Sequence, residues 1–432
     1  MITVIATALL GNGFSLNSIG PKGAGLGGAF VGQADDATAV YWNPAGLTDQ
    51  DASVNFSIAD VYMAPTYKNE TAGIDAEGAD VNHLSPHLFM NYTQDKFSWG
   101  FGLYVPHGLG SEWYGEDFTA LAGPAELAPG LANPFAGKEF DWYAKIVMLS
   151  VSSSAGYKVT DKFSVGMTVN INHGYMEIER GEDRISLTAT PGTPTLGEDG
   201  MIDTQYREDV EGSGTSFGFG IQYDVCEKLT LGLSYHSPSV VALKGDATLE
   251  FASGDEDLYV RRDLEIPMWV AFGSSFRATD KWKFNFDVHF TKWATFDKMV
   301  TQVVMDSGTE NILTHMDWED CFQYRFGTEY LATENLALRA GYFYDPAPAP
   351  DETLNILFPS SENHNLAGGF GYTLGSVTLD FTAEYYFGQE RDVEQAEHNM
   401  GGIHFHVQRM PQTCRERIYV SAQITTNNLQ FC

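Results

Sequence analysis

The sequence predicts an all-β protein: an antiparallel transmembrane β-barrel of about fourteen strands, plugged by a small N-terminal hatch. Three observations lead to this prediction. From about residue 51 onward, apolar and polar residues alternate with period two. The connections between these stretches alternate between short turns and long polar loops. Residues 12–50 show no such alternation, which sets them apart from the barrel wall.

The composition favours strands and excludes several classes of protein. Aromatic residues make up 13% of the 432 residues and glycine occurs 44 times, a balance typical of strands and tight turns. No apolar run approaches the roughly eighteen residues of a membrane helix. The formal charge of −32 excludes nucleic acid as a partner, because phosphates need a basic surface. The 4 cysteines form no CxxC pair, which excludes a zinc ribbon and a disulfide scaffold.

Residues 1–11 form a short apolar run, MITVIATALLG, that ends in small residues. An export signal has this pattern, but the run lacks a basic start and is too short to be a complete signal. We therefore interpret residues 1–11 as a residual signal peptide. The alternative is an N-terminal strand.

Residues 12–50 are interpreted as a hatch inside the barrel. A fourteen-stranded barrel encloses a lumen too wide to be filled by the side chains of its wall, so a separate segment has to plug it. The segment is rich in Gly and Ala, which pack closely. Asp35 or Asp36 can cap a short helix that runs to residue 42, and Pro44 and Gly46 then end the helix and reverse the chain.

Residues 51–432 are assigned to the barrel and its long extracellular loops. In FSWGFGLYV (97–105) the residues Phe97, Trp99, Phe101, Leu103 and Val105 face one way, and the intervening residues face the other. A soluble β-sandwich also alternates, but here the hydrophilic face carries charges in mid-strand. The residues of this kind that we expect to face the lumen are Lys283, Asp287, His289, Arg325, Arg339, Asp380 and Glu384.

The connections give the barrel two different rims. The short turns are nearly a repeat: TQDKF, VTDKF, VCEKL, ATDKW, ATENL and TLGSV. Long polar loops are expected near residues 62–81, 107–140, 180–205, 245–262, 292–320, 345–362 and 388–415. Short turns on one rim and long loops on the other are typical of outer-membrane barrels. Interfacial girdles are expected from Trp99, Trp142, Trp269, Trp282 and Tyr330.

The acidic loops would face outward, where divalent cations could bridge them to lipopolysaccharide phosphates. An equally good interpretation is a merely solvated acidic surface. We expect a monomer in the outer membrane of a Gram-negative bacterium, in contact with outer-membrane lipid and lipopolysaccharide, without cofactor or metal.

The opening stretch NGFSLNSIGPKGAGLGGAFVGQADDATAVYWNPAGLT resembles the hatch of the FadL family of outer-membrane long-chain fatty acid transporters, which also holds TodX-type aromatic hydrocarbon channels. Further similar stretches follow in order: YVPHGLGSEW (104–113), AGYKVTDKFSVG (155–166), LGLSYHS (231–237), FGTEYLATENLALRAGYFYDPAPAPDETL (326–354) and HNLAGGFGY (364–372). The resemblance covers the chain up to about residue 390. It implies passive uptake of a hydrophobic compound, in the first place a long-chain fatty acid, with an aromatic hydrocarbon as the alternative.

The resemblance also implies where the ligand and the gate lie. In the family, the mature N-terminus reaches into the ligand pocket, which maps onto Asn12, Gly13 and Phe14. The hatch carries an Asn-Pro-Ala motif, here residues Asn43, Pro44 and Ala45.

The third strand of such proteins is kinked and opens a hole in the wall, which maps onto residues 97–107. Within this range, alternation places Gly100 and Gly102 on the lumen face, where glycine permits a kink. These two glycines are our candidates for the lateral opening.

A carboxylate ligand would need a cation in the otherwise apolar pocket, because an unpaired buried charge is costly. Alternation places Lys145, Arg325 and Arg339 on the lumen face, and arginine suits a bidentate grip. The alternative is that these residues pair with lumen acids such as Asp380 or Glu384.

The C-terminal tail departs from the family pattern. Its candidate closing strand alternates through Ile418, Val420, Ala422 and Ile424. A barrel of this kind normally ends on an aromatic residue, whereas here Cys432 follows Phe431.

Other functions fit the same sequence less well. An outer-membrane lipase or esterase barrel is the rival enzyme class, although no G-x-S-x-G occurs. A general porin is disfavoured by the plug and by the lack of a charged constriction loop. GAGLGG fits G-x-G-x-x-G but lacks a βαβ context. His398, His404 and His406 have a spacing that a metal could use, but one face of a strand or loop explains it more simply.

Overall fold

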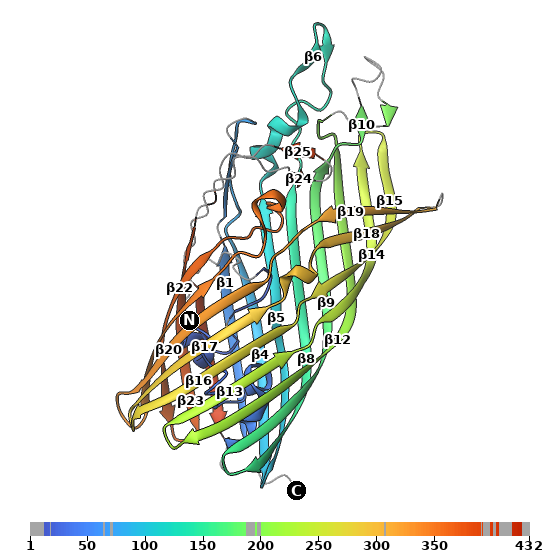
Figure 1. Cartoon of the computed structure of the whole chain (residues 1–432). Helices are drawn as coiled ribbons and strands as arrows, with labels where there is room; N and C mark the ends of the chain where they lie inside the picture. The colour runs from blue at the N-terminus through green and yellow to red at the C-terminus, as the bar shows by residue number, and fades with distance from the viewer. Residues whose placement is uncertain are drawn as a thin grey trace.

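The computed structural model describes residues 13–17, 19–63, 65–69, 72–186, 195–196, 200–305, 308–389, 391, 398–400, 403–405 and 417–425. One antiparallel sheet of 18 strand segments dominates this part of the chain and is rolled into a tall barrel (Figure 1). Residues 1–11, Asn12, His404's side chain and the end of the tail at Phe431 and Cys432 lie outside what is described.

Four of the barrel strands are each interrupted by a short break. Across one break, His236 pairs with Trp269 and Ser239 pairs with Ile266, so the same register continues on both sides. The interrupted strands are β13 (Leu229–His236) with β14 (Ser239–Phe251), β15 (Gly254–Ile266) with β16 (Trp269–Thr279), β17 (Trp282–Thr291) with β18 (Lys298–Met305), and β19 (Gly308–His315) with β20 (Cys321–Leu331). The 18 segments, less these four breaks, make fourteen strands, which confirms the predicted fold class.

The remaining strands complete the wall. They are β1 (Ser53–Met63), β4 (Val81–Gln94), β5 (Phe97–Trp113), β8 (Trp142–Thr160), β9 (Phe163–Glu182), β12 (Thr204–Cys226), β21 (Leu336–Asp345), β22 (Asn363–Leu374), β23 (Val377–Gly388) and β26 (Arg417–Thr425). The tail segment β26 pairs with β23 on one side and with β1 on the other, as a closing strand must.

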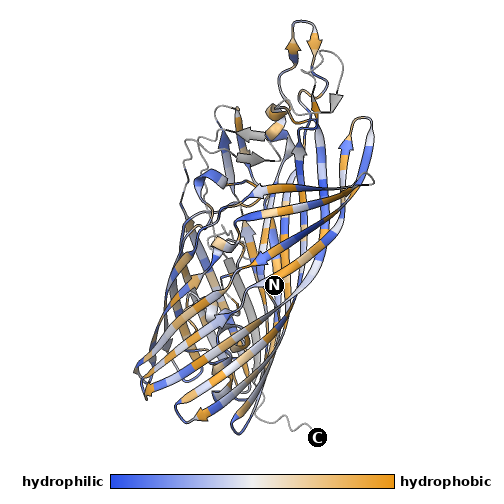
Figure 2. Cartoon of the chain, turned by 45° about the vertical axis from the view of Figure 1, so that its right-hand side comes forward, coloured by the Kyte–Doolittle hydropathy of each residue, from blue (hydrophilic) through white to orange (hydrophobic). Residues whose placement is uncertain are grey.

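Hydrophobic and hydrophilic residues alternate along the strands of the lower barrel (Figure 2), and the exposed residues among them are mostly apolar. On β9, Met167, Val169 and Ile171 are exposed, whereas Thr168 and Asn170 between them are buried. The same alternation exposes Phe217 on β12 and Phe326 on β20. This is the face pattern of a wall that meets hydrocarbon outside and a filled lumen inside.

The polarity of the wall inverts toward the upper end of the barrel. On β8, Ala144 and Ile146 are fully buried, while Lys145 between them lies on the outer side and pairs with Glu177 at 3.5 Å. The buried apolar side chains there belong to one large core cluster beneath the loops. Where water replaces lipid outside, apolar side chains gain by turning inward.

This inversion corrects two predictions. Lys145 does not face the lumen, because our rule of apolar outward and polar inward fails above the lipid belt. The expected loops at 245–262 and 292–320 are largely continued strands for the same reason: β14 and β15, and β18 and β19, still alternate, but with their apolar face inside.

Two of the five expected girdle residues are also misplaced. Trp99, Trp282 and Tyr330 are 50%, 43% and 40% exposed on the outer wall, as expected. Trp142 is 0% exposed in the upper core, and Trp269 stacks on Tyr41 inside the barrel.

Short elements complete the upper end. They are the hairpins β2 (Thr66–Asn69) with β3 (Ile74–Glu77), β6 (Glu126–Ala128) with β7 (Leu131–Ala132), β10 (Ile185–Ser186) with β11 (Thr195–Leu196) and β24 (His398–Met400) with β25 (Ile403–Phe405), and the 3-10 helices η2 (Gly115–Ala122), η3 (Trp293–Thr295) and η4 (Asp351–Thr353). None of the helices in the described ranges is both long and apolar enough to span a membrane.

Candidate functional site

Residues 13–50, which we call the inner segment, pack against the lumen face of the barrel wall. The segment contains α1 (Pro21–Gly25), α2 (Ala39–Trp42) and the 3-10 helix η1 (Pro44–Asp49). Wall side chains from three different strands donate hydrogen bonds to its carbonyls: Thr382 to Pro21 (2.7 Å), Thr168 to Val40 (3.1 Å) and Gln222 to Gly32 (3.1 Å). Contacts on several sides fix the segment inside the lumen (Figure 1).

Glycine allows the inner segment to touch the wall directly. A Cβ at Gly341 of β21 would collide with the backbone of Gly27, and a Cβ at Gly32 would come within 2.7 Å of the backbone of Ser274. Gly27 also has a φ of 63°, a conformation that favours glycine. The glycine-rich run therefore serves close packing.

Asn43 bonds both to the barrel wall and to other residues of the inner segment. Its amide donates to the carbonyl of Ile221 on β12 (3.0 Å) and to that of Val31 (2.9 Å), and its Oδ1 accepts from the amide of Ala45 (3.2 Å). Pro44 lies where a Cβ at Gly166 of β9 would collide with it. In the turn before α2, Asp36 rather than Asp35 accepts from the Thr38 amide (2.8 Å).

A chain of ion pairs makes a second attachment, which the sequence analysis missed. Asp35 pairs with Lys22 of α1 (2.7 Å) and with Lys283 of β17 (3.2 Å). Lys283 also approaches Glu329 (3.8 Å), and Glu329 pairs with Arg339 (2.8 Å). Burial alone would raise the pKa of Asp35, but the two lysines hold it well below its usual range. Asp35 therefore stays charged at neutral pH.

Arg339 is the last residue in this series of ion pairs, and it pairs with two carboxylates. Besides Glu329 it pairs with Asp380 on β23. Of the two possibilities left open by the sequence, the structure brings Arg339 together with lumen acids.

Phe14 sits in a cage of aromatic rings. Its ring makes edge-on contacts with Trp293 (4.9 Å between centroids), Phe296 (5.7 Å) and His107 (5.9 Å), and a tilted contact with Trp318 (6.0 Å). Edge-on packing at these separations is favourable for aromatic rings. Phe14 is 0% exposed.

Strand β5 separates from its neighbour β4 in its upper half. The ladder between them ends at the pair Leu88–Leu103, although both strands continue, and a bulge between Tyr104 and His107 interrupts the pairing of β5 with β8. Pro106 within this bulge has no backbone N–H to donate. The break lies at the end of the range 97–107 in which we expected a kink.

The candidates Gly100 and Gly102 lie below this break. Both face the lumen, but both stay paired, with Asn91 and Phe89 on β4 and with Ser154 and Ser152 on β8. The sequence-based choice is thus several residues too low, because the proline, not the glycines, interrupts the ladder. The bulge also turns Val105, predicted to face outward, into the interior, where it is 9% exposed.

The start of the inner segment lies along the edge of β5 that the break frees. Leu16 donates its backbone N–H to the carbonyl of Pro106 (2.9 Å), and Gly108 donates to the carbonyl of Phe14 (2.9 Å). The Ser15 hydroxyl lies 3.2 Å from Nδ1 of His107. Residues 14–16 thus pair with the edge of β5 through one antiparallel bridge, Ser15 with His107.

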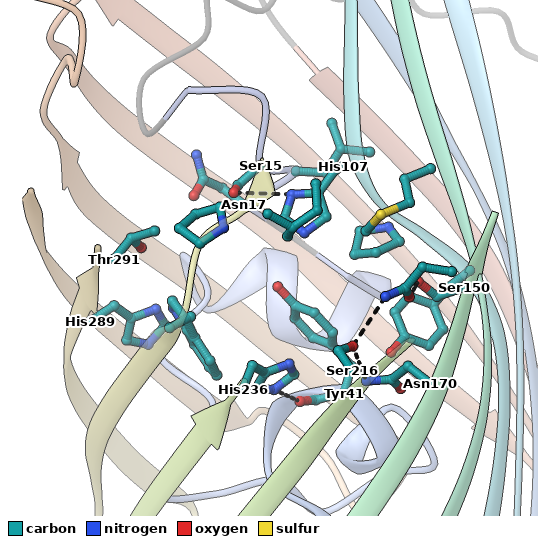
Figure 3. A pocket seen from close by; sticks show the side chains of 18 of the residues that line it. Ser15, Asn17, Tyr41, His107, Ser150, Asn170, Ser216, His236, His289 and Thr291 are labelled. Atoms are coloured by element: carbon teal, nitrogen blue, oxygen red, sulfur yellow. Dashed lines mark hydrogen bonds between the residues drawn. The ribbon is translucent and has the colours of Figure 1, made fainter. Parts of the chain in front are cut away.

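Two cavities meet at Leu16. The inner cavity lies between the inner segment and the wall, and Figure 3 shows the side chains around it, among them Tyr41, His236 and Ser216. The second cavity, which we call the wall cavity, lies at the break between β4 and β5. Its lining includes Leu84, which is 69% exposed on the outer surface. Leu16 lines both cavities and so separates them.

Arg325 lines the inner cavity and differs from Arg339. Its guanidinium is 1% exposed, stacks over Phe343 at 4.4 Å and donates to carbonyl and amide oxygens of Asn17, Gly27 and Gln323. Its Nε–H has no acceptor within the described part of the chain. Among the described residues it forms no ion pair with a carboxylate.

Of the predicted site residues, Arg325 lines the inner cavity, Phe14 lies beside it against the lining residue His107, and Lys145 lies outside. Gly13 lies against Trp293 and Trp318, where a Cβ would not fit. The roles of Leu16, Asn17 and the caging tryptophans were missed, because alternation describes strands and gives no information on how an irregular segment packs.

The chain is similar to known proteins over almost its whole length. A family model described as "Outer membrane protein transport protein (OMPP1/FadL/TodX)" matches residues 2–428. A putative outer membrane protein of Neisseria meningitidis is 24% identical and covers 85% of this chain and 86% of its own. Outer membrane protein P1 of Haemophilus influenzae is 24% identical and covers 88% of this chain and 92% of its own.

Solved structures share the fold at low identity. The toluene transporter TodX of Pseudomonas putida has a TM-score of 0.77 at 18% identity, covering 96% of this chain and 100% of its own. A FadL homologue of Pseudomonas aeruginosa has a TM-score of 0.73 at 18% identity, covering 96% and 99%. The toluene transporter TbuX of Ralstonia pickettii has a TM-score of 0.72 at 19% identity, covering 96% and 100%.

Proposed function

Because this chain belongs to the family of outer membrane transport proteins that includes OMPP1, FadL and TodX, we propose that it carries long-chain fatty acids passively across the outer membrane. As a member of that family it is an outer membrane transport protein for hydrophobic compounds, not an enzyme. This family membership argues against the lipase alternative.

The proposed path runs sideways through the wall. The ligand lands among the extracellular loops, enters the inner cavity and leaves through the wall cavity between β4 and β5. The observation that carries this path is the position of Leu16 between the two cavities. Residues 13–50 act as the hatch that keeps water and ions from passing straight down the lumen, with Asn43, Pro44 and Ala45 as its anchor.

Arg325 favours a fatty acid as the ligand. Among the described residues, Asp345 reaches this buried guanidinium only through Asn17 and Gln323, and a ligand carboxylate in direct contact would offset more of the cost of burying the charge. Lys145 takes no part in this, since it lies on the outer wall, and Arg339 is engaged by Glu329 and Asp380.

An aromatic hydrocarbon is the second candidate, and the Phe14 cage favours it. Four rings surround the Phe14 side chain, and a ligand ring that displaced it would find the same edge-on contacts. This candidate does not use Arg325.

Uptake of radiolabelled fatty acid tests the proposed function. The protein is expressed in cells that lack their own outer-membrane fatty acid transporter, and uptake of oleate is measured against uptake of toluene. We expect oleate uptake well above that of cells with an empty vector. Toluene uptake without oleate uptake would select the second candidate, and uptake of neither would contradict the proposal.

A further inference from the structure

Asn17 holds the Arg325 guanidinium in the arrangement that a carboxylate would adopt. Its backbone carbonyl oxygen accepts from Nη1 of Arg325 at 3.3 Å, and its side-chain Oδ1 accepts from Nη2 at 2.8 Å. Two oxygens on the two terminal nitrogens of one guanidinium form the bidentate pattern of arginine–carboxylate pairs. Here both oxygens come from one uncharged residue of the same chain.

A true carboxylate would hold this arginine better than Asn17 does. A carboxylate would add the attraction of its negative charge to the same two hydrogen bonds, whereas Asn17 contributes no charge to a guanidinium that is 1% exposed. Two other acceptors would keep Arg325 in place during an exchange: the Gly27 carbonyl (3.1 Å) and Oε1 of Gln323 (2.9 Å).

Asn17 also bonds to a carboxylate of the wall, that of Asp345. Its Nδ2 donates to Oδ2 of Asp345 at 2.5 Å, and Gln323 donates to both Asn17 (2.8 Å) and Asp345. If Asn17 moves away from Arg325, Asp345 still accepts a hydrogen bond, because Gln323 remains as its donor.

The residue before Asn17 is Leu16, which separates the inner cavity from the wall cavity. Leu16 is held by a single backbone hydrogen bond to Pro106 and by the pairing of residues 14–16 with the free edge of β5. One planar peptide unit joins the two residues, so a shift of the Asn17 backbone also moves the backbone of Leu16. A displacement of Asn17 therefore pulls on the side chain that closes the path.

We propose that Asn17 is an in-chain stand-in for the ligand's carboxylate at Arg325, and that its replacement by the ligand withdraws Leu16 and joins the two cavities. The inference rests on the proposed function. It makes opening depend on the ligand's charged end: a fatty acid exchanges with Asn17, whereas a neutral chain of equal length has nothing with which to displace it.

Substitution of Asn17 tests the exchange. In the unaltered protein, dodecanoate has to break the Asn17 contacts before it can bind. In Asn17→Ala the Oδ1 acceptor on Nη2 of Arg325 is gone, while the backbone carbonyl on Nη1 remains. The affinity for dodecanoate should therefore rise about tenfold, the equivalent of one hydrogen bond to a charged group. The affinity for 1-dodecanol should stay the same. Both are measured by isothermal titration calorimetry in one detergent.

Two control variants make the outcome specific. Ser15→Ala removes the contact with His107 from the same short segment and should affect the two ligands equally. Adding Arg325→Gln to Asn17→Ala should abolish the gain for dodecanoate. An equal change for both ligands in Asn17→Ala, no change for either, or a gain that survives Arg325→Gln would overturn the inference. Failure of the unaltered protein to bind either ligand would instead contradict the proposed function.

Discussion

At the scale of single residues, Phe14 is the side chain whose place a ligand ring could take. Replacing it by alanine empties the cage of Trp293, Phe296 and Trp318 without touching the hydrogen bonds of the backbone of residues 14–16. We expect Phe14→Ala to raise the affinity for a small aromatic ligand severalfold, because the ligand no longer competes with an internal ring. Quenching of tryptophan fluorescence by toluene would report this change.

The matched control for this variant is Phe118→Ala. Phe118 is equally buried and stacks on Tyr67 in the upper core, outside both cavities. It should lose stability, as large-to-small core changes do, without a change in toluene affinity. If both variants altered toluene binding alike, the cage would not be the binding place.

Gly110 controls the width of the wall cavity. A Cβ at this position would collide with the ring of His83, which faces it across the break between β4 and β5. We expect Gly110→Val to reduce oleate uptake at least severalfold while leaving the amount of barrel in the membrane unchanged. Gly368→Val is the control, because that mid-strand glycine has open space around its Cβ position. Normal uptake by Gly110→Val would remove the lateral exit from the account.

Arg325 and Arg339 show which features of single residues could be predicted from the sequence. Alternation placed Arg325 and Arg339 in the lumen correctly, since both strands lie within the lipid belt, where the outer face must be apolar. Alternation could not show that Arg339 pairs with two carboxylates, whereas Arg325 bonds to uncharged oxygens. That difference depends on Asn17, which lies 308 residues away in sequence, and no local pattern records such a contact.

At the scale of elements, substitutions in the anchor of the inner segment should change ion conductance, whereas a substitution in its first residues should not. Asn43→Ala combined with Pro44→Gly removes two buried hydrogen bonds to carbonyls, each worth about 1 kcal/mol, and adds backbone freedom. We expect this variant to admit small ions, seen as new conductance steps in planar bilayers. Phe14→Ala should stay closed in the same assay.

A third variant tests the ion-pair chain as a separate attachment. Glu329→Gln removes the carboxylate that links Lys283 to Arg339 and leaves two buried cations less compensated. We expect an intermediate conductance, below that of the Asn43 and Pro44 double variant. Conductance equal to that of the unaltered protein would mean that the chain does not hold the segment.

The strands illustrate both the strength and the limit of pattern reading. Fourteen strands and an irregular opening segment follow from period-two alternation and from its absence. The positions where alternation misled are those above the lipid belt, at Lys145 and in β14, β15, β18 and β19. There the solvent outside the wall changes from lipid to water, and the same alternation describes the opposite orientation.

At the scale of the whole molecule, the wall and the inner segment form one folded unit. Glycines of the segment touch the backbone of β21, and Asn43 bonds to β12, so the segment and the wall share their packing. The fold itself was predictable because a lipid-facing wall constrains every second residue. The two cavities were not, because they depend on a proline bulge and on how one leucine fills the gap.

The central claim is that this barrel passes hydrophobic molecules sideways while staying closed to ions. The most direct test measures both properties on one preparation: oleate transfer across the membrane of reconstituted vesicles, and ion conductance of the same protein in planar bilayers, with the variant lacking residues 12–50 as the open reference. The account predicts oleate transfer without measurable conductance for the intact protein, and large conductance for the deletion. Steady conductance of the intact protein, or a deletion that conducts no better than the intact chain, would contradict it.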